Sequence, residues 1–177
     1  MKEQKIILNN KQIKDIISKL ALEIQEHHPD LSNLILVGIL SAGYPLAKRI
    51  TKSIYKSTGV NVPIGKLDIA LYRDDLLLRE DFVTIRESNI PYDIRNKTLI
   101  IIDDVLFHAR TIRAALNAVM DFGTPAKVEL AVLIDRGFRE LPIIANYIGQ
   151  EIKTKKTDYI QVDISENENK EDKVILE

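Results

Sequence analysis

Three short, mainly apolar runs place the strongest constraint on how this 177-residue chain can fold. They span Leu34 to Ile39, Thr98 to Ile102 and Val128 to Ile134. Apolar runs of this length are typical of strands that are covered on both faces, as in parallel sheets. All three are far shorter than the roughly 20 apolar residues that cross a bilayer. We therefore expect the core of a parallel sheet, and no transmembrane helix.

Segments with helical spacing of apolar side chains alternate with these runs. The first follows the N-cap candidates Asn9 and Asn10 and ends near residue 28, the second runs from about 45 to 59, and the third from about 110 to 122. Proline in a first turn and glycine at a helix end support the last two. Strands that alternate with amphipathic helices predict one α/β domain over residues 1–177, with a mainly parallel sheet and right-handed crossovers.

The remaining segments give weaker signals. Leu67, Ile69 and Leu71 alternate with other residues, which predicts a half-covered strand. Residues 73–97 carry no convincing element except a short strand from Phe82 to Ile85, and so long a connection is typical of a functional, mobile loop. The segment from Glu151 onward holds five basic and eight acidic residues, and we expect residues 164–177 to form a solvated tail.

The composition narrows the classes of function. The formal net charge is −1, and cysteine is absent, which excludes disulfides, thiol nucleophiles and cysteine-based zinc sites. With only three histidines, a zinc site built from protein ligands alone is not expected. The first residues lack the apolar stretch of a secretory signal, so a cytoplasmic protein is expected.

An acidic pair, Asp103–Asp104, directly follows the second apolar run. The loops after Ile39, Ile102 and Ile134 should meet at the carboxyl edge of the sheet, where ligands bind in open α/β folds. Two adjacent carboxylates there need water, hydroxyl groups or a cation. The alternative is structural, with one carboxylate capping the following turn and the other facing solvent. From the pair alone, both interpretations stand.

The next residues favour a binding site. Arg110 and Thr111 lie at the predicted start of a helix, where free backbone N–H groups and the helix dipole attract anions. A guanidinium and a hydroxyl add matching donors. Carboxylates that accept from sugar hydroxyls, next to a cup for a phosphate, form a layout suited to a ribose 5-phosphate.

The string TLIIIDDVLFHARTIRAA, residues 98–115, resembles the phosphoribosyl-diphosphate (PRPP) motif of the type I phosphoribosyltransferases. More narrowly, the chain is similar to the branch of bacterial pyrimidine-operon attenuation regulators that double as uracil phosphoribosyltransferases. Further matching strings are ILVGI (35–39), LAKRI (46–50), DIALYRDDL (68–76), IPYDI (90–94) and LAVLIDRGFRELPI (130–143). The resemblance implies a type I phosphoribosyltransferase fold, with a central parallel sheet flanked by helices and a small hood.

The resemblance also implies roles. PRPP and uracil, or the product UMP, would be the ligands, with Mg²⁺ bound through PRPP rather than directly by protein. Asp103 and Asp104 would be the catalytic carboxylates that bind the ribose hydroxyls. The 5-phosphate would be bound by the following loop and helix start: Leu106, Phe107, His108, Ala109, Arg110 and Thr111. Pyrophosphate would lie at Ser41, Ala42 and Gly43, the base at Asp135 and Arg136, and a mobile loop would include Arg73, Asp74 and Arg86.

Two departures from the family pattern leave turnover open. Where the family usually reads Tyr-Thr-Gly-Arg-Thr, this chain has His108 and Ala109 at the second and third positions. His108 either replaces the lost hydroxyl as a donor or reflects relaxed phosphate binding, and Ala109 adds a Cβ where unusual backbone dihedrals are needed. Where the family usually reads Lys-Thr-Arg-Gly, residues 40–43 carry no charge, which weakens pyrophosphate binding by one to two powers of ten, roughly.

The chain could therefore be an active enzyme, a non-catalytic nucleotide-binding regulator, or a generic phosphate-binding protein. RNA binding needs a basic face, and Ile144 stands where the regulator branch tends to have arginine. The basic candidates for such a face are few: Lys19, Arg49, Arg136, Arg139 and the cluster Lys153, Lys155 and Lys156. This pattern disfavours RNA as a partner. Assembly into a homo-oligomer is expected from the resemblance alone.

Overall fold

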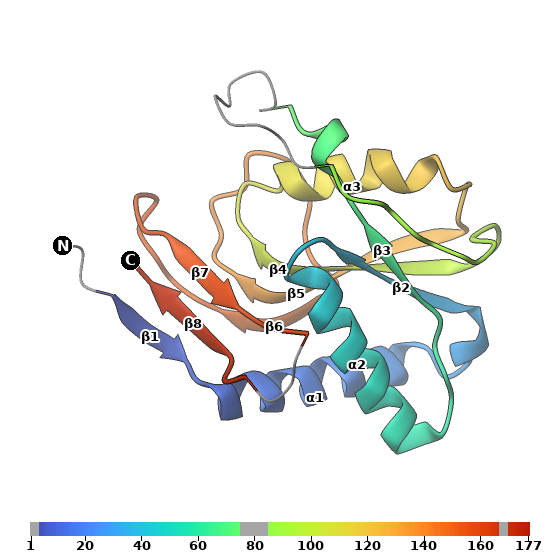
Figure 1. Ribbon diagram of the computed structural model, residues 1–177, viewed down its shortest axis with the longest axis horizontal. Helices are drawn as coiled ribbons and strands as arrows, with labels where there is room; N and C mark the ends of the chain where they lie inside the picture. The colour runs from blue at the N-terminus through green and yellow to red at the C-terminus, as the bar shows by residue number, and fades with distance from the viewer. Residues whose placement is uncertain (1–3, 75–84, 167–169) are drawn as a thin grey trace.

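The computed structural model describes residues 4–74, 85–166 and 170–177. Its centre is a five-stranded parallel sheet in the order β3-β2-β4-β5-β6. The strands are β2 (Leu34–Ile39), β3 (Ile64–Leu67), β4 (Thr98–Leu106), β5 (Lys127–Asp135) and β6 (Tyr147–Glu151), and the helices are α1 (Asn10–His27), α2 (Gly43–Thr58) and α3 (Arg110–Met120). Helices α1 and α2 cover one face of the sheet and α3 covers the other (Figure 1). The predicted α/β architecture is confirmed.

The three helices begin and end where the sequence signals lie. Asn9 caps α1 through a reciprocal pair of 3.0 Å hydrogen bonds with Gln12, and α2 ends at Gly59 in the left-handed conformation. The apolar stripes of the helices are buried against the sheet. No helix within the described ranges is both long and apolar enough to span a membrane.

One strand prediction is wrong in its bounds. The predicted strand over Leu67–Leu71 ends at Leu67, and residues Ala70–Tyr72 form a 3-10 turn. The Oδ1 atom of Asp68 accepts a hydrogen bond of 2.9 Å from the Ala70 amide, which favours the turn and leaves Leu71 64% exposed. The predicted strand from Phe82 lies outside the described residues, apart from the exposed Ile85.

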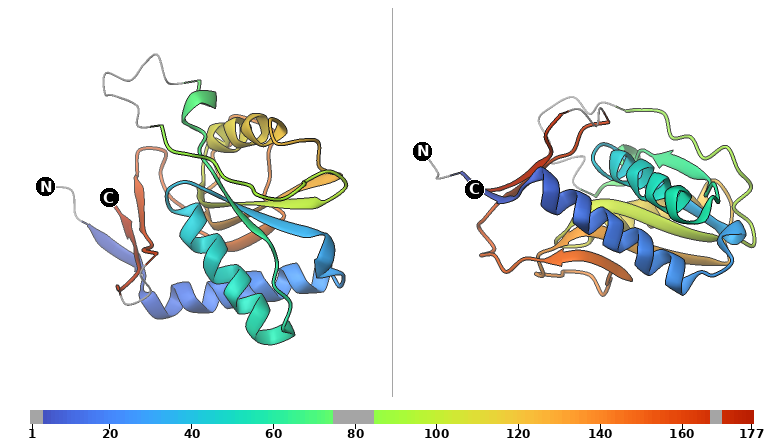
Figure 2. Two further views of the ribbon diagram at one scale, coloured as in Figure 1. Left: turned by 45° about the vertical axis from the view of Figure 1, so that its right-hand side comes forward. Right: turned by 90° about the horizontal axis from the view of Figure 1, so that it is seen from below.

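A second, antiparallel sheet is formed by β1 (Lys5–Leu8), β8 (Lys173–Leu176) and β7 (Ile160–Asp163), in that order. This hood stands beside the carboxyl edge of the parallel sheet (Figures 1 and 2). Val174 is fully buried, and the carboxylate of Asp172 is buried against the guanidinium of Arg49. The prediction of a solvated tail over 164–177 is therefore wrong for β8, because the acidic composition masked a short apolar strand that pairs with β1.

Candidate functional site

The acidic pair lies inside β4. We predicted that the strand ends at Ile102, before the pair, but it continues to Leu106, paired with β5 up to Asp135. Asp103 is buried and Asp104 is half-buried, with its Oδ1 atom accepting from the Val105 amide at 2.9 Å. Burial raises the pKa of Asp103 well above its ordinary value, and the neighbouring charge of Asp104 raises it further; burial also raises the pKa of Asp104. Two carboxyls kept at this energetic cost are typical of a functional site.

The loop at residues 40–43, here named the α2 loop, packs directly against this pair. A Cβ atom on Gly43 would lie 2.3 Å from the carbonyl oxygen of Ile102 and 3.2 Å from the Cα atom of Asp103, so only glycine fits. The loop contains a cis peptide bond between Leu40 and Ser41. The predicted pyrophosphate residues Ser41, Ala42 and Gly43 are thus brought next to the acidic pair.

The loop and helix start at residues 106–111, here named the α3 loop, surround a pocket of 240 Å³ lined by residues 105–112 and Arg73. Ala109 precedes α3 with φ 68° and ψ 7°, a left-handed conformation in a residue that is buried. The sequence analysis anticipated unusual dihedrals at this alanine, and that prediction is confirmed. Because alanine has no acceptor to cap the helix, the first amides of α3 are left for a bound anion.

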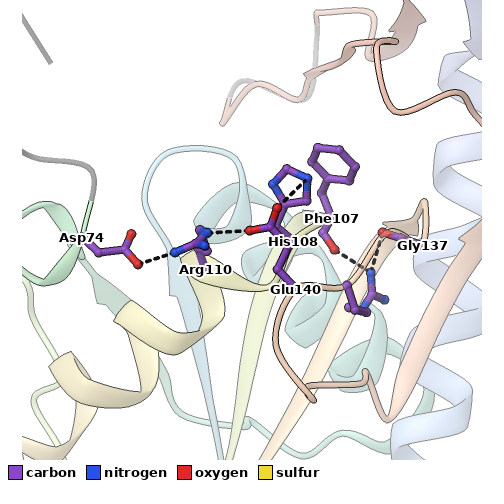
Figure 3. Close-up of polar contacts among 7 residues, drawn as sticks. Asp74, Phe107, His108, Arg110, Gly137 and Glu140 are labelled. Atoms are coloured by element: carbon purple, nitrogen blue, oxygen red, sulfur yellow. Dashed lines mark hydrogen bonds and ion pairs between the residues drawn. The ribbon is translucent and has the colours of Figure 1, made fainter. Parts of the chain in front are cut away.

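Charged side chains join the α3 loop to two other segments (Figure 3). Arg110 donates from Nε to Glu140 at 2.8 Å and from Nη1 to Asp74 at 2.8 Å, and Arg113 lies 3.2 Å from the same Asp74 carboxylate. The hydrogen bond from Arg110 holds the pKa of Glu140 below its ordinary value. Of the predicted mobile-loop residues, Asp74 therefore contacts α3, and Arg73 lines the pocket. The amide of the third, Arg86, donates to Asp68.

The loop after β5 supports the α3 loop. Arg139 donates to the carbonyl oxygens of Phe107 at 2.9 Å and Gly137 at 3.1 Å, and it pairs with Asp135. Asp135 also accepts from the Gly137 amide at 2.9 Å. The sequence analysis missed Arg139 as a site residue, although its position four residues after Asp135 is a spacing at which opposite charges can pair.

The predicted base-binding arginine is committed to internal contacts. Arg136 is 6% exposed, and it donates to the carbonyl oxygens of Lys155 at 3.1 Å and Asp158 at 2.8 Å. Its guanidinium lies 3.9 Å from the ring centre of Phe107. Arg136 thus connects the α3 loop with the segment before β7, and a direct contact of Asp135 or Arg136 with a base stays a prediction.

The described residues contain no group of three or more histidine, aspartate or glutamate side chains arranged to hold a metal ion. Two adjacent carboxylates still suit a hard cation such as Mg²⁺ when other oxygen ligands come with a bound molecule. The acidic pair therefore fits a cation that arrives with a diphosphate.

Residues 3–169 match the family model described as "Phosphoribosyl transferase domain". The chain belongs to the phosphoribosyltransferase family. Its curated relatives include "Bifunctional protein PyrR" of Chloroflexus aurantiacus, 45% identical over 99% of this chain and 97% of the relative. The protein of the same name from Caldicellulosiruptor bescii is 44% identical over 100% of this chain and 97% of the relative. The resemblance drawn from residues 98–115 and the further strings is confirmed.

Solved structures agree with the fold of this chain. The hypoxanthine phosphoribosyltransferase of Trypanosoma cruzi matches 97% of this chain and 95% of its own, with a TM-score of 0.72 at 16% identity. The hypoxanthine phosphoribosyltransferase of Staphylococcus aureus matches 88% of this chain and 80% of its own, with a TM-score of 0.67 at 20% identity. The predicted type I phosphoribosyltransferase fold is confirmed, and at these identities the structures bear on the fold alone.

Proposed function

We propose that this protein transfers the 5-phosphoribosyl group of PRPP to uracil, giving UMP and pyrophosphate in pyrimidine metabolism. The observation that carries the proposal is the position of the buried acidic pair between the α2 loop and the pocket of the α3 loop. Similarity to relatives named "Bifunctional protein PyrR" supports the choice of substrates. In the reaction, N1 of uracil forms a bond to C1 of the ribose while the bond from C1 to the diphosphate oxygen breaks, and the N1 proton is released.

Each part of the site has a task in this reaction. Asp103 and Asp104 accept hydrogen bonds from the ribose hydroxyls and orient C1 towards the base. Amides at the start of α3, with Arg110 and Thr111, hold the 5-phosphate. Mg²⁺ bound through PRPP would supply positive charge to the departing diphosphate.

The α2 loop offers the diphosphate backbone amides and the Ser41 hydroxyl, without a charged side chain. Arg73 lines the neighbouring pocket, and its charge acts to lower the pKa of Asp103. We propose that Arg73 contributes part of the charge that the α2 loop lacks. Arg73, Asp74 and Arg86, which flank the centre of the predicted mobile loop, would then complete the site; residues 75–84 between them lie outside the described residues.

An assay with PRPP, Mg²⁺ and labelled uracil tests the transfer. We expect UMP from the wild-type chain, and loss of at least about 100-fold in rate from Asp104→Asn, because charge-stabilising groups contribute on this scale. Asp163→Asn, in an exposed pair with Lys173 on the hood, serves as the matched control and should be fully active. Folded wild-type protein that forms no UMP would overturn the enzyme proposal.

A non-catalytic regulator that binds UMP, with RNA as its partner, is the second candidate. The uncharged α2 loop favours it, as does a surface groove of 390 Å³ between α1 and α2. Basic side chains line this groove from both helices: Lys14, Arg49, Lys52 and Lys56. This clustering could not be predicted from the sequence, because the four residues are spread over two helices.

Two measurements test the second candidate. UMP held at 100 times its dissociation constant should stabilise a binding protein by about 2.7 kcal/mol, whereas plain phosphate at the same concentration should do much less. If RNA binds at the groove, its affinity should fall with salt, and Lys14→Gln with Lys56→Gln should reduce the salt slope by about two. Binding insensitive to salt would contradict contacts with the RNA backbone. We also propose that the protein is cytoplasmic and forms a homo-oligomer, and light scattering can test the oligomeric state.

A further inference from the structure

His108 occupies an unusual place in the α3 loop. Its ring stacks on Phe107, with ring centres 3.6 Å apart. Its Nε2 atom is buried, and among the described residues it has no hydrogen-bond partner. The Glu140 carboxylate lies 3.7 Å from this nitrogen, which is too far for a hydrogen bond (Figure 3). Buried polar atoms without partners are rare in folded proteins, and each one calls for an explanation.

The charges around the pocket show what His108 could add. Arg110 is bonded to both Glu140 and Asp74, and Arg113 also meets Asp74. Two cations and two anions thus nearly cancel on this side of the pocket. A phosphate dianion that enters meets an arginine whose charge is already shared with carboxylates. A proton on His108 would change the local balance by one positive charge.

Other charges face this histidine from the neighbouring elements. On the loop after β5, Arg136 lies over the Phe107 ring to which His108 is stacked, and Arg139 binds the Phe107 carbonyl. Lys156 acts on Glu140 from the segment before β7, and Arg73 lines the same pocket. Arginine and lysine side chains stay charged near neutral pH, so imidazole is the one side-chain type among these groups whose charge can change there.

We propose that an anion bound in the α3 pocket takes up a proton on His108, whose Nε2–H then donates to a phosphate oxygen. Affinity for the anion therefore rises as pH falls from about 8 to about 6, the range in which imidazoles titrate. By linkage, the bound anion raises the affinity of His108 for its proton. Threonine, which the family usually has here, could not give this dependence. The inference rests on the proposed function only in taking the α3 pocket as the phosphate site.

Inorganic sulfate is the suitable probe, because it stays a dianion across this range whereas phosphate itself titrates near pH 6. Calorimetric titration should show sulfate binding about tenfold more tightly at about pH 6 than at about pH 8, the gain expected from one charge-assisted hydrogen bond. In ¹⁵N NMR, sulfate should shift the titration of one histidine to higher pH. His108→Thr identifies that signal by its loss.

Variants make the test specific. His108→Gln keeps a neutral donor, so it should bind sulfate about as the wild type does at about pH 8 and gain little at about pH 6. His27→Gln, at an exposed histidine that ends α1, is the matched control and should keep the full gain. An equal gain in His108→Gln and wild type, or a histidine titration that sulfate leaves unmoved, would overturn the inference. UMP synthesis by the wild type would still uphold the proposed function in that event.

Discussion

The α3 loop and the α2 loop both adjoin the acidic pair, but different forces hold them in place. Arg139 and Arg110 fix the α3 loop by hydrogen bonds and ion pairs to other segments. The α2 loop has no charged side chain and depends on the fit of Gly43 against β4. Electrostatic contacts therefore hold one loop and close packing holds the other, so substitutions of opposite kinds should disrupt them.

The largest effect is expected at Gly43. In Gly43→Ala, the new Cβ would lie 2.3 Å from the Ile102 carbonyl oxygen, so the α2 loop or β4 must shift. We expect a loss of about 3 kcal/mol in the free energy of unfolding, measured in urea, because overpacking a tight contact costs this much. Ser41→Ala, at an exposed position in the same loop, is the control and should cost less than about 0.5 kcal/mol. Equal stability of the two variants would contradict a loop held by shape.

Arg139→Lys tests the electrostatic side of the comparison. Lysine keeps the charge but cannot reproduce the planar fork that reaches Phe107, Gly137 and Asp135 together. We expect the free energy of unfolding to fall by about 2 kcal/mol, and affinity for UMP to fall with it, since the α3 loop loses its support. Thermal denaturation with and without UMP measures both. Arg95→Lys, in an exposed pair with Asp93, should change stability by less than about 0.5 kcal/mol.

Substitution in the acidic pair should raise the free energy of unfolding, whereas most substitutions lower it. Asp103→Asn removes a buried charge, and we expect it to raise the free energy of unfolding at pH 7 by about 0.5–2 kcal/mol while it impairs UMP formation, as for other sites where stability and activity conflict. Urea denaturation and the transfer assay measure the two effects. Lower stability together with lower activity would indicate a structural role instead.

The pH dependence of this variant follows from the raised pKa of Asp103. Below the folded-state pKa the folded protein binds a proton that the unfolded chain does not yet bind, so folding gains stability as pH falls towards the unfolded-state pKa. The stability advantage of Asp103→Asn over wild type should therefore be largest at neutral pH and shrink as the solution is acidified. An advantage that grows with acid would contradict a raised pKa.

The smallest effect on the free energy of unfolding is expected for Ala109→Gly, at the backbone position in the α3 loop that has a positive φ angle. Glycine adopts the left-handed conformation at φ 68° without the steric cost that alanine bears, which we expect to stabilise the fold by about 0.5–1 kcal/mol. Ala114→Gly, in the interior of α3, should instead destabilise the fold by about 1 kcal/mol. Opposite signs for two identical substitutions, measured by urea denaturation, are the result to look for.

Much of the fold could be predicted because its signals are local. Apolar runs gave β2, β4 and β5, and cap residues such as Asn9 and Gly59 gave the helix ends. The acidic pair and the anion-binding helix start could likewise be predicted, since both lie within a few residues of β4. Adjacent positions in sequence are enough to place such features.

What could not be predicted depends on contacts between distant residues. Arg139 contacts Phe107 and Glu140 contacts Arg110 across about thirty positions, and no local pattern encodes these pairs. The alternation at Leu67–Leu71 suggested a strand, but the Asp68 side chain favours a turn. The two-residue apolar core of β8 was hidden among charges because its partner, β1, lies at the other end of the chain.

The pairing of β1 with β8 has a consequence for biosynthesis. Strand β1 is synthesised long before β8, and it lacks its sheet partner until residue 176 has left the ribosome. The parallel sheet from β2 to β6 can form earlier, since all its strands precede residue 152. Contacts of such long sequence separation form slowly. The nascent protein should therefore pass through a stage in which the core is assembled while the first strand waits unpaired, a natural moment for chaperones to bind.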